Sequence, residues 1–324
     1  GRQCRPFLSA ITHRASRISH HGSEMARGTP VIAVFTKNRT NPAYAAARLG
    51  ADRVAARLGT RIAHYVPDQP DDVAEQKVLV EHAIAGRPDA AVFVPVHATA
   101  MSDSVRKLEA AGIPIVNYLN RLAEGRFVTY VGSDDYQLAH DIAAYLFRHI
   151  GATGDVAILE GVPAAVTSQE RLRGFRDAAR DSPGIHVVAS RAADYQQVTA
   201  RRVTAELLAR LPRVDGILCA NDVMALGAIE ALDAAGRRIA LVGVNALPEA
   251  IAAIKKGKLL ATADFDAMAI SSIATEAAIR HLRGERIPAQ IILPVRIVDA
   301  ANYEAWDRPF EERESPRWED VVKG

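Results

Sequence analysis

The chain is built from a regular alternation of short, continuously apolar runs with Ala-rich segments of helical period. In residues 214–236, VDGILCANDVMALGAIEALDAAG, the apolar run ends at Asn221-Asp222 and the helical pattern follows directly. Continuous apolar runs indicate parallel strands that are buried on both faces. Because Asn and Asp are favoured helix N-caps, this pair is predicted to lie at the carboxyl end of a strand, where open α/β sheets bind ligands.

The alternation runs through the chain as two successive series. Predicted strands cover residues 31–36, 61–66, 90–95 and 113–118, and then 127–132, 155–160, 185–190, 214–220, 238–244, 259–265 and 291–300. Besides the helix after Asn221, predicted helices cover residues 42–58, 71–85, 98–111, 135–150, 169–181, 197–211 and 267–283. We therefore predict an α/β protein of two doubly wound parallel-sheet lobes, joined by a three-segment hinge and separated by a cleft.

Breaks in the alternation give the expected division of the chain. The N-terminal lobe is expected to comprise residues 29–132 plus 265–293, the C-terminal lobe residues 133–264 plus 294–310, and a tail residues 311–324. Residues 1–28 are polar and basic without periodicity, which is typical of a disordered leader or a tag. From residue 302 onwards, Pro and charged residues interrupt any βα pattern. We expect this part to wrap against a surface and to bury Trp306, Phe310 and Trp318.

Composition excludes several classes of function. The net charge is +2, and the Lys and Arg residues are scattered, so no nucleic-acid partner is expected. Cys4 and Cys219 are too few for a disulfide framework or a cysteine metal cluster. No run approaches the roughly 18 apolar residues of a transmembrane helix, and residues 1–28 contain no apolar core of a secretion signal.

Sequence motifs of common α/β enzymes are missing. The first predicted strand-to-helix turn, TKNRTNPAY, has no glycine with which to approach a pyrophosphate. The chain also has no phosphate-binding loop, no G-x-S-x-G elbow and no H-E-x-x-H helix. We therefore expect a binding protein without catalytic residues, cofactor or metal.

Amide, hydroxyl and aromatic side chains stand at the predicted strand ends instead. The amides and Arg are Asn41, Asn120, Arg121, Gln169, Asn221 and Asn245, and the aromatics are Tyr44, Tyr195 and Phe265. Amides donate and accept hydrogen bonds, and aromatic faces cover the apolar faces of sugar rings. A single Asn at such a position is more often only a helix cap, but the shared edge of these residues favours a neutral, hydroxyl-rich ligand.

Five ordered motifs resemble a known family. They are TNPAY (40–44), IPIVNYLNR (113–121), ERLRGF (170–175), ANDVMALGAI (220–229) and LVGVNALPEA (241–250). Together they resemble the type I periplasmic binding proteins of the ribose/galactose class, which feed ABC importers, and the homologous effector domains of LacI-type repressors. The resemblance implies a two-lobed fold that closes on a sugar.

The family's ligand positions fall on the nine residues named above, and Phe35, His97, Asp264 and Asp266 are further candidates. Asn120 and Asn245 occupy positions at which pentose- and hexose-binding members of the family have carboxylates. Gln169 occupies the position of an Arg, and Ala43 that of an aromatic residue. A site with less charge anchors a ring less firmly, because charge-assisted hydrogen bonds are the stronger ones. A polyol, a cyclitol or a modified sugar therefore fits at least as well as ribose. Asn221 is expected to contact the ligand, and Asp222 to cap or brace its helix.

The expected function is that of a monomeric, periplasmic solute-binding protein that presents its closed form to an ABC permease. The alternative is the effector-binding domain of a LacI-type regulator. That alternative requires an N-terminal helix-turn-helix, and residues 1–28 show no pair of amphipathic helices.

Overall fold

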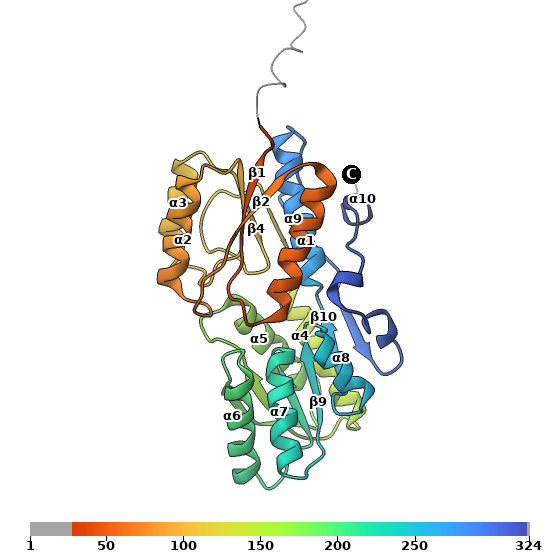
Figure 1. Ribbon diagram of the computed structural model, residues 1–324. Helices are drawn as coiled ribbons and strands as arrows, with labels where there is room; N and C mark the ends of the chain where they lie inside the picture. Colours follow the sequence, from red (N-terminus) through yellow and green to blue (C-terminus); the bar gives the residue numbers. More distant parts are fainter. Residues whose placement is uncertain (1–27, 323–324) are drawn as a thin grey trace, which may run out of the picture.

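The structure, a computed structural model, describes residues 28–322 and consists of two α/β lobes (Figure 1). Apart from Gly28, the predicted leader lies outside the described residues. Each lobe contains a six-stranded sheet with helices on both faces. No helix among the described residues has the length and apolarity needed to cross a membrane.

The sheet of the N-terminal lobe is entirely parallel, in the order β11-β5-β4-β3-β1-β2. Its strands are β1 (Val31–Phe35), β2 (Arg61–Tyr65), β3 (Ala90–Phe93), β4 (Ile115–Tyr118), β5 (Thr129–Gly132) and β11 (Gln290–Ile292). Helices α1 (Pro42–Leu58) and α9 (Ala267–Leu282) cover one face, and α2 (Val73–Ala85) and α3 (Ser102–Ala110) cover the other.

Strand β1 shows why the apolar runs are continuous. Ile32 and Val34 are buried in the same core as α1 and α9, whereas Ala33 and Phe35 are buried in a second core with α2 and α3. Successive side chains of a strand point to opposite faces, so a strand covered on both faces needs apolar residues at every position.

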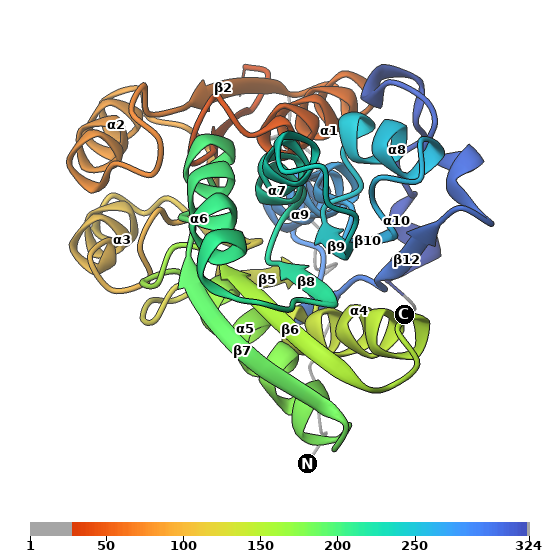
Figure 2. The same cartoon turned by 90° about the horizontal axis from the view of Figure 1, so that it is seen from below.

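The sheet of the C-terminal lobe has the order β12-β10-β9-β8-β6-β7. Its strands are β6 (Gly154–Glu160), β7 (Ile185–Ala192), β8 (Gly216–Cys219), β9 (Ala240–Val244), β10 (Ala261–Asp264) and β12 (Arg296–Asp299). Its helices are α4 (Asp135–His149), α5 (Val166–Arg180), α6 (Gln197–Arg210), α7 (Asp222–Ala234) and α8 (Pro248–Lys255). Helices α4 and α5 pack together, as do α6 and α7 on the other side of the sheet (Figure 2).

Two details of the predicted elements are wrong. The run predicted as one strand over residues 291–300 forms two strands in different sheets: β11 pairs parallel with β5, and β12 pairs antiparallel with β10. Pro294 lies between them and lacks the backbone N–H that a continuous ladder requires. The eight-residue helix α8 was not predicted, because two turns are too short to give a clear period.

The chain passes between the two sheets three times, as the predicted fold requires. The crossings lie between β5 and α4, between β10 and α9, and between β11 and β12. Beyond β12, residues 302–322, here termed the C-terminal segment, form η1 (Tyr303–Ala305), η2 (Phe310–Glu312) and α10 (Trp318–Val321). Trp318 is buried as expected, whereas Trp306 and Phe310 are only half-buried.

Helices α1 and α9 are in close contact at Gly50. A Cβ atom at this position would overlap the carbonyl oxygen of Met268 and lie 2.7 Å from Ser272 Oγ. Gly50→Ala is therefore expected to lower the free energy of unfolding by about 1–3 kcal/mol, because an overpacked core forces neighbouring atoms to shift. Urea denaturation measures the change. Ala45→Ser on the exposed face of α1 is the control, and equal stability of the two variants would contradict the close packing.

Candidate functional site

A cavity of about 270 Å³ lies between the lobes, at the carboxyl ends of strands from both sheets. The N-terminal lobe contributes the turn after β1, the start of α1 and the residues that follow β4. The C-terminal lobe contributes the residues that follow β8 and β9 and the starts of α4 and α6. Residues of all these turns are close together because parallel strands end at the same edge of their sheet.

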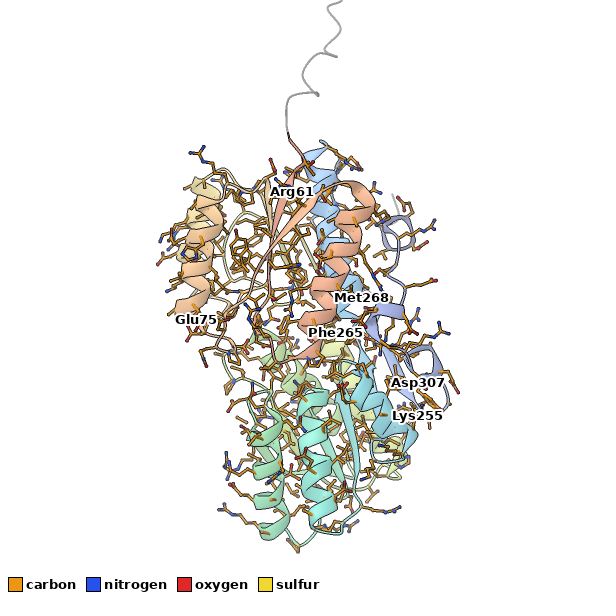
Figure 3. All side chains as sticks on the ribbon, in the orientation of Figure 1. Arg61, Glu75, Lys255, Phe265, Met268 and Asp307 are labelled. Atoms are coloured by element: carbon orange, nitrogen blue, oxygen red, sulfur yellow. The ribbon has the colours of Figure 1, made fainter. Side chains whose placement is uncertain are left out.

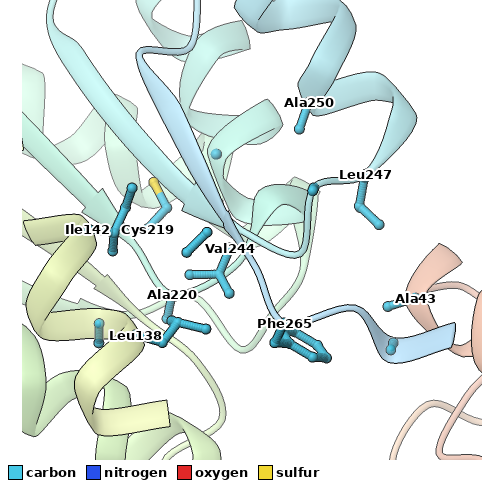
Figure 4. Packing of buried hydrophobic residues seen from close by; sticks show 14 of the residues in the cluster. Ala43, Leu138, Ile142, Cys219, Ala220, Val244, Leu247, Ala250 and Phe265 are labelled. Carbon is cyan, nitrogen blue, oxygen red and sulfur yellow. The ribbon is translucent and has the colours of Figure 1, made fainter. Parts of the chain in front are cut away.

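Seven of the nine principal candidates from the sequence line this cavity. They are Asn41, Tyr44, Asn120, Tyr195, Asn221, Asn245 and Phe265. Phe265 follows β10 and lies between Ala220 of the C-terminal lobe and Ala43 of α1 (Figure 4). Asn41 caps α1, since its Oδ1 accepts from the N–H of Ala43 at 3.0 Å. That these seven residues bind a ligand remains a prediction.

Gln169 and Arg121 lie outside the cavity wall. Gln169 is exposed and donates to the carbonyl of Pro163, whereas Thr167 and Arg171 line the cavity. Thr167 and Arg171 are four residues apart and share one face of α5, so Gln169, two residues from each, points away. Arg121 is exposed, donates to Gln290 Oε1 at 2.8 Å and stacks on the ring of Tyr130.

The four further candidates have structural roles. Phe35 is fully buried in the core that contains α2 and α3, with its ring centroid 4.9 Å from that of Phe93. His97 accepts hydrogen bonds from backbone N–H groups of the turn that follows it. Asp264 accepts from Trp306 Nε1 at 2.6 Å, and Asp266 caps α9 by accepting from the N–H of Ala269. None of the four lines the interlobe cavity.

Two buried ion pairs in the cavity wall were missed in the sequence. Lys37 Nζ lies 2.9 Å from Asp71 Oδ1 in the N-terminal lobe, and Arg171 Nε lies 2.8 Å from Asp135 Oδ1 in the C-terminal lobe. Lys37 follows β1, Asp71 precedes α2 and Asp135 begins α4, whereas Arg171 lies inside α5. Charged side chains at such positions are not distinguished in the sequence from those of solvated helix faces. The expectation of a weakly charged site is therefore wrong, although the formal charges of the four residues cancel.

Arg171 is the most constrained of these charged groups. Its Nη1 donates to the carbonyl of Ala220 at 2.7 Å, and its Cζ lies 5.3 Å from the centroid of the Phe265 ring. Burial raises the pKa of Asp135, and the positive charge of Arg171 opposes that rise. The ion pair thus offsets part of the cost of burying this carboxylate.

Asn221 and Asn245 each leave one buried polar atom without a partner among residues 28–322. Asn221 Oδ1 caps α7 by accepting from the N–H of Met224 at 2.9 Å, which leaves its Nδ2 unpaired. Asn245 Oδ1 is also buried and unpaired. Because buried polar groups almost always have partners, this donor and this acceptor are the two amide atoms at which a ligand contact is expected.

Asp222 braces the loops that carry these amides. Its Oδ2 accepts from the N–H of Leu247 at 2.9 Å, and its Oδ1 accepts from Thr262 Oγ1 at 2.7 Å. Gly243 makes room for this carboxyl, because a Cβ atom there would overlap Asp222 Oδ1. Asp222 therefore connects α7 to β9 and β10, while Asn221 provides the cap of α7.

Tyr195 is positioned by its backbone and by Gly161. Its φ of +59° lies in the left-handed region, and a Cβ atom at Gly161 would overlap its ring. Burial raises the pKa of both Tyr195 and Tyr44, so the two hydroxyls stay protonated at neutral pH and can donate hydrogen bonds. Among the described residues, no group of three or more His, Cys, Asp or Glu side chains could hold a metal ion.

Comparison with known proteins identifies the relatives of this chain. The model of the periplasmic binding protein domain family matches residues 32–286. The ribose import binding protein of Bacillus subtilis (strain 168) is 31% identical over 266 residues, which cover 82% of this chain and 85% of that protein. The D-ribose/D-allose-binding protein of Pseudomonas aeruginosa is 30% identical over 267 residues, which cover 79% of this chain and 83% of that protein.

Solved structures of sugar- and polyol-binding proteins have the same fold. An ABC transporter periplasmic solute-binding protein from Actinobacillus succinogenes 130z with bound D-allose superimposes with a TM-score of 0.81 at 32% identity, covering 84% of this chain and 98% of that chain. An ABC transporter solute-binding protein from Bacillus halodurans C-125 with bound myo-inositol gives a TM-score of 0.80 at 26% identity, covering 86% of this chain and 98% of that chain.

Asp222 predicts a dependence of stability on pH. Burial raises its pKa to about 6, so the folded protein binds this proton more tightly than the unfolded chain does. The protonated carboxyl of Asp222 therefore adds about 3 kcal/mol to the free energy of unfolding below about pH 4. This contribution is lost as the pH rises to 6.

Urea denaturation at pH 4, 5, 6 and 7 measures this contribution as the difference in unfolding free energy between the wild type and Asp222→Asn. An Asn at this position still accepts from Leu247 and can donate to Thr262 Oγ1. The wild type should lose stability relative to the variant as the pH rises. Glu249→Gln at an exposed position of α8 is the control, and a difference that does not vary with pH would refute the assignment.

Proposed function

This chain belongs to the family of periplasmic binding proteins, and on that premise we propose that it is the solute-binding protein of an ABC importer. It is not an enzyme, and its ligand is a neutral, polyhydroxylated small molecule. The relatives named above are import or solute-binding proteins, so the alternative of a LacI-type effector domain gains no support from them.

The observation that carries the proposal is an unpaired donor and an unpaired acceptor in a cavity whose charges cancel. Asn221 Nδ2 and Asn245 Oδ1 need partners, and a pair of hydroxyl groups can satisfy both. A charged ligand would leave an uncompensated charge in the buried site, because Lys37 and Arg171 are already neutralised by Asp71 and Asp135.

The size of the cavity supports a ligand with a single ring. Its volume of about 270 Å³ lies just below the range for small-molecule sites, roughly 300–1,000 Å³. The proteins from A. succinogenes and B. halodurans are described with bound D-allose and myo-inositol. A monosaccharide or a cyclitol is the class of ligand that we propose here.

We assign the following roles to the residues of the wall. Asn41, Asn120, Asn221 and Asn245 bind hydroxyl groups, and Arg171 is an additional donor to the ligand. Tyr44, Tyr195 and Phe265 cover the apolar faces of the ring. The aromatic residues come from both lobes, so ligand binding draws the lobes together.

The same proposal includes the organisation of the chain and its partners. The N-terminal lobe comprises residues 29–132 plus 265–293, the C-terminal lobe residues 133–264 plus 294–310, and the tail residues 311–324. The protein acts in the periplasm as a monomer without a nucleic-acid partner. Its lobes close by hinge bending, and the closed form is presented to the membrane permease.

A thermal-shift screen across sugars, polyols and cyclitols tests the ligand class. A cognate ligand at 100 times its Kd should stabilise the protein by about 2.7 kcal/mol and raise its melting temperature. Sugar acids and amino sugars are the charged controls and should give no shift. The proposal is wrong if no neutral polyhydroxylated compound shifts the transition.

Asn221→Ser separates the ligand contact from the helix cap. Serine is a good N-cap, so stability should change by less than about 0.5 kcal/mol. Loss of Nδ2 should weaken ligand binding by about 1–3 kcal/mol, measured by titration calorimetry. Asn221→Ala removes both functions and should lose about 1 kcal/mol of stability in addition. Unchanged affinity in the Ser variant would show that Nδ2 does not contact the ligand.

A further inference from the structure

The C-terminal segment runs along both lobes on one side of the molecule (Figure 1). It lies beyond residues 32–286, the part of the chain that the family model matches. We infer that this segment is a strap that ties the two lobes together and favours their closed arrangement.

Contacts with the C-terminal lobe hold the first half of the segment. Trp306 Nε1 donates to Asp264 Oδ2 at 2.6 Å, at the end of β10. Asp307 Oδ2 lies 2.6 Å from the Nζ of Lys255, the last residue of α8 (Figure 3). These contacts hold η1 and the residues after it against β10 and α8.

Contacts with the N-terminal lobe hold the second half. Trp318 is buried, and the guanidinium of Arg280 in α9 lies 5.0 Å from the centroid of its ring. Arg280 Nη2 also lies 2.7 Å from Glu319 Oε1. In α1, Arg53 donates from Nη1 to the carbonyl of Arg313 at 2.6 Å and from Nη2 to the carbonyl of Glu311.

Arg313 contacts both lobes at once. Its Nη1 donates to the carbonyl of Ala246, in the loop after β9 of the C-terminal lobe, at 3.2 Å. Its own carbonyl accepts from Arg53 of the N-terminal lobe. Two further bonds, from its Nε to the carbonyl of Arg308 and from its Nη2 to the carbonyl of Trp306, fold the segment around this side chain.

Beside the contact of Trp306 with Asp264, a cavity of about 960 Å³ lies between the segment and two of the lobe crossings. Asp264, Asp266 and Pro294 of the crossings line one side of it, and Trp306, Phe310 and Arg313 line the other. The segment therefore bridges the lobes without filling the space around the crossings. Rotation of the lobes about these crossings changes the distance between the segment's contacts with the C-terminal lobe and its contacts with the N-terminal lobe. Opening of the lobes must therefore break one of these two sets of contacts.

Tryptophan fluorescence reports directly on the segment. The chain has two tryptophans, Trp306 and Trp318, and both lie in it. Collisional quenching by acrylamide therefore measures how firmly the segment is docked. Small-angle scattering gives the radius of gyration, which measures the separation of the lobes. Neither measurement needs a ligand, so the test does not depend on the proposed function.

The experiment compares Arg53→Gln and Lys255→Met with matched controls in the complete protein. Lys258→Met is the control for Lys255, because Lys258 forms an ion pair of the same length, 2.6 Å, with Asp233 inside the C-terminal lobe. Arg61→Gln changes an exposed arginine of the N-terminal lobe and is the control for Arg53. Urea denaturation confirms that all four variants are folded.

Each test variant loses one surface contact, which contributes only a fraction of a kcal/mol, so the segment should dock less firmly. We expect the quenching constant of the tryptophans to rise about twofold in both variants. Both should also increase the radius of gyration, whereas the controls should match the wild type. If quenching increases but the radius of gyration does not, the segment docks without holding the lobes and the inference is wrong. If neither quantity changes in either variant, these contacts do not hold the segment and the inference is equally wrong.

Discussion

The ion pair between Arg171 and Asp135 is the interaction on which the interlobe site depends. Arg171, on α5, pairs with Asp135 at the start of α4 and donates to the carbonyl of Ala220 just before α7. A single guanidinium therefore connects these three helices. A buried charge without a partner would be strongly unfavourable, and this pairing offsets much of that cost. Together with the pair of Lys37 and Asp71, it leaves the four charged residues of the wall without a net charge, and the proposed class of ligand rests on that balance.

Much of the fold could be predicted from the sequence, because strands buried on both faces must be apolar throughout. The three crossings and the two lobes followed from breaks in that alternation. The antiparallel pairing of β12 could not be predicted in this way, because residues 291–300 read as one apolar run. The lobe boundary expected between residues 293 and 294 does fall between β11 and β12, but the direction in which β12 pairs depends on which sheet has a free edge, and that is a property of the assembled lobes.

For the site, amides and aromatics at strand ends were recognisable because a polar residue after an apolar run is conspicuous. On α5 the prediction fell on Gln169, whereas Arg171, two residues further on, lines the cavity. Its identification requires the phase of α5, which starts at Val166 and turns Gln169 outward. The pair of Lys37 with Asp71 was missed for another reason: the two residues are 34 positions apart and meet only after β1 and β2 have paired.

The shortness of the three crossings limits how the lobes can move. Three residue steps separate Gly132 from Asp135 and Asp264 from Ala267, and four separate Ile292 from Arg296. Even when fully extended, such links span at most about 10–14 Å. The lobes can therefore swing about a nearly fixed axis but cannot slide apart, and the path of opening has few degrees of freedom. A ligand thus meets the same two facing edges each time the cleft closes.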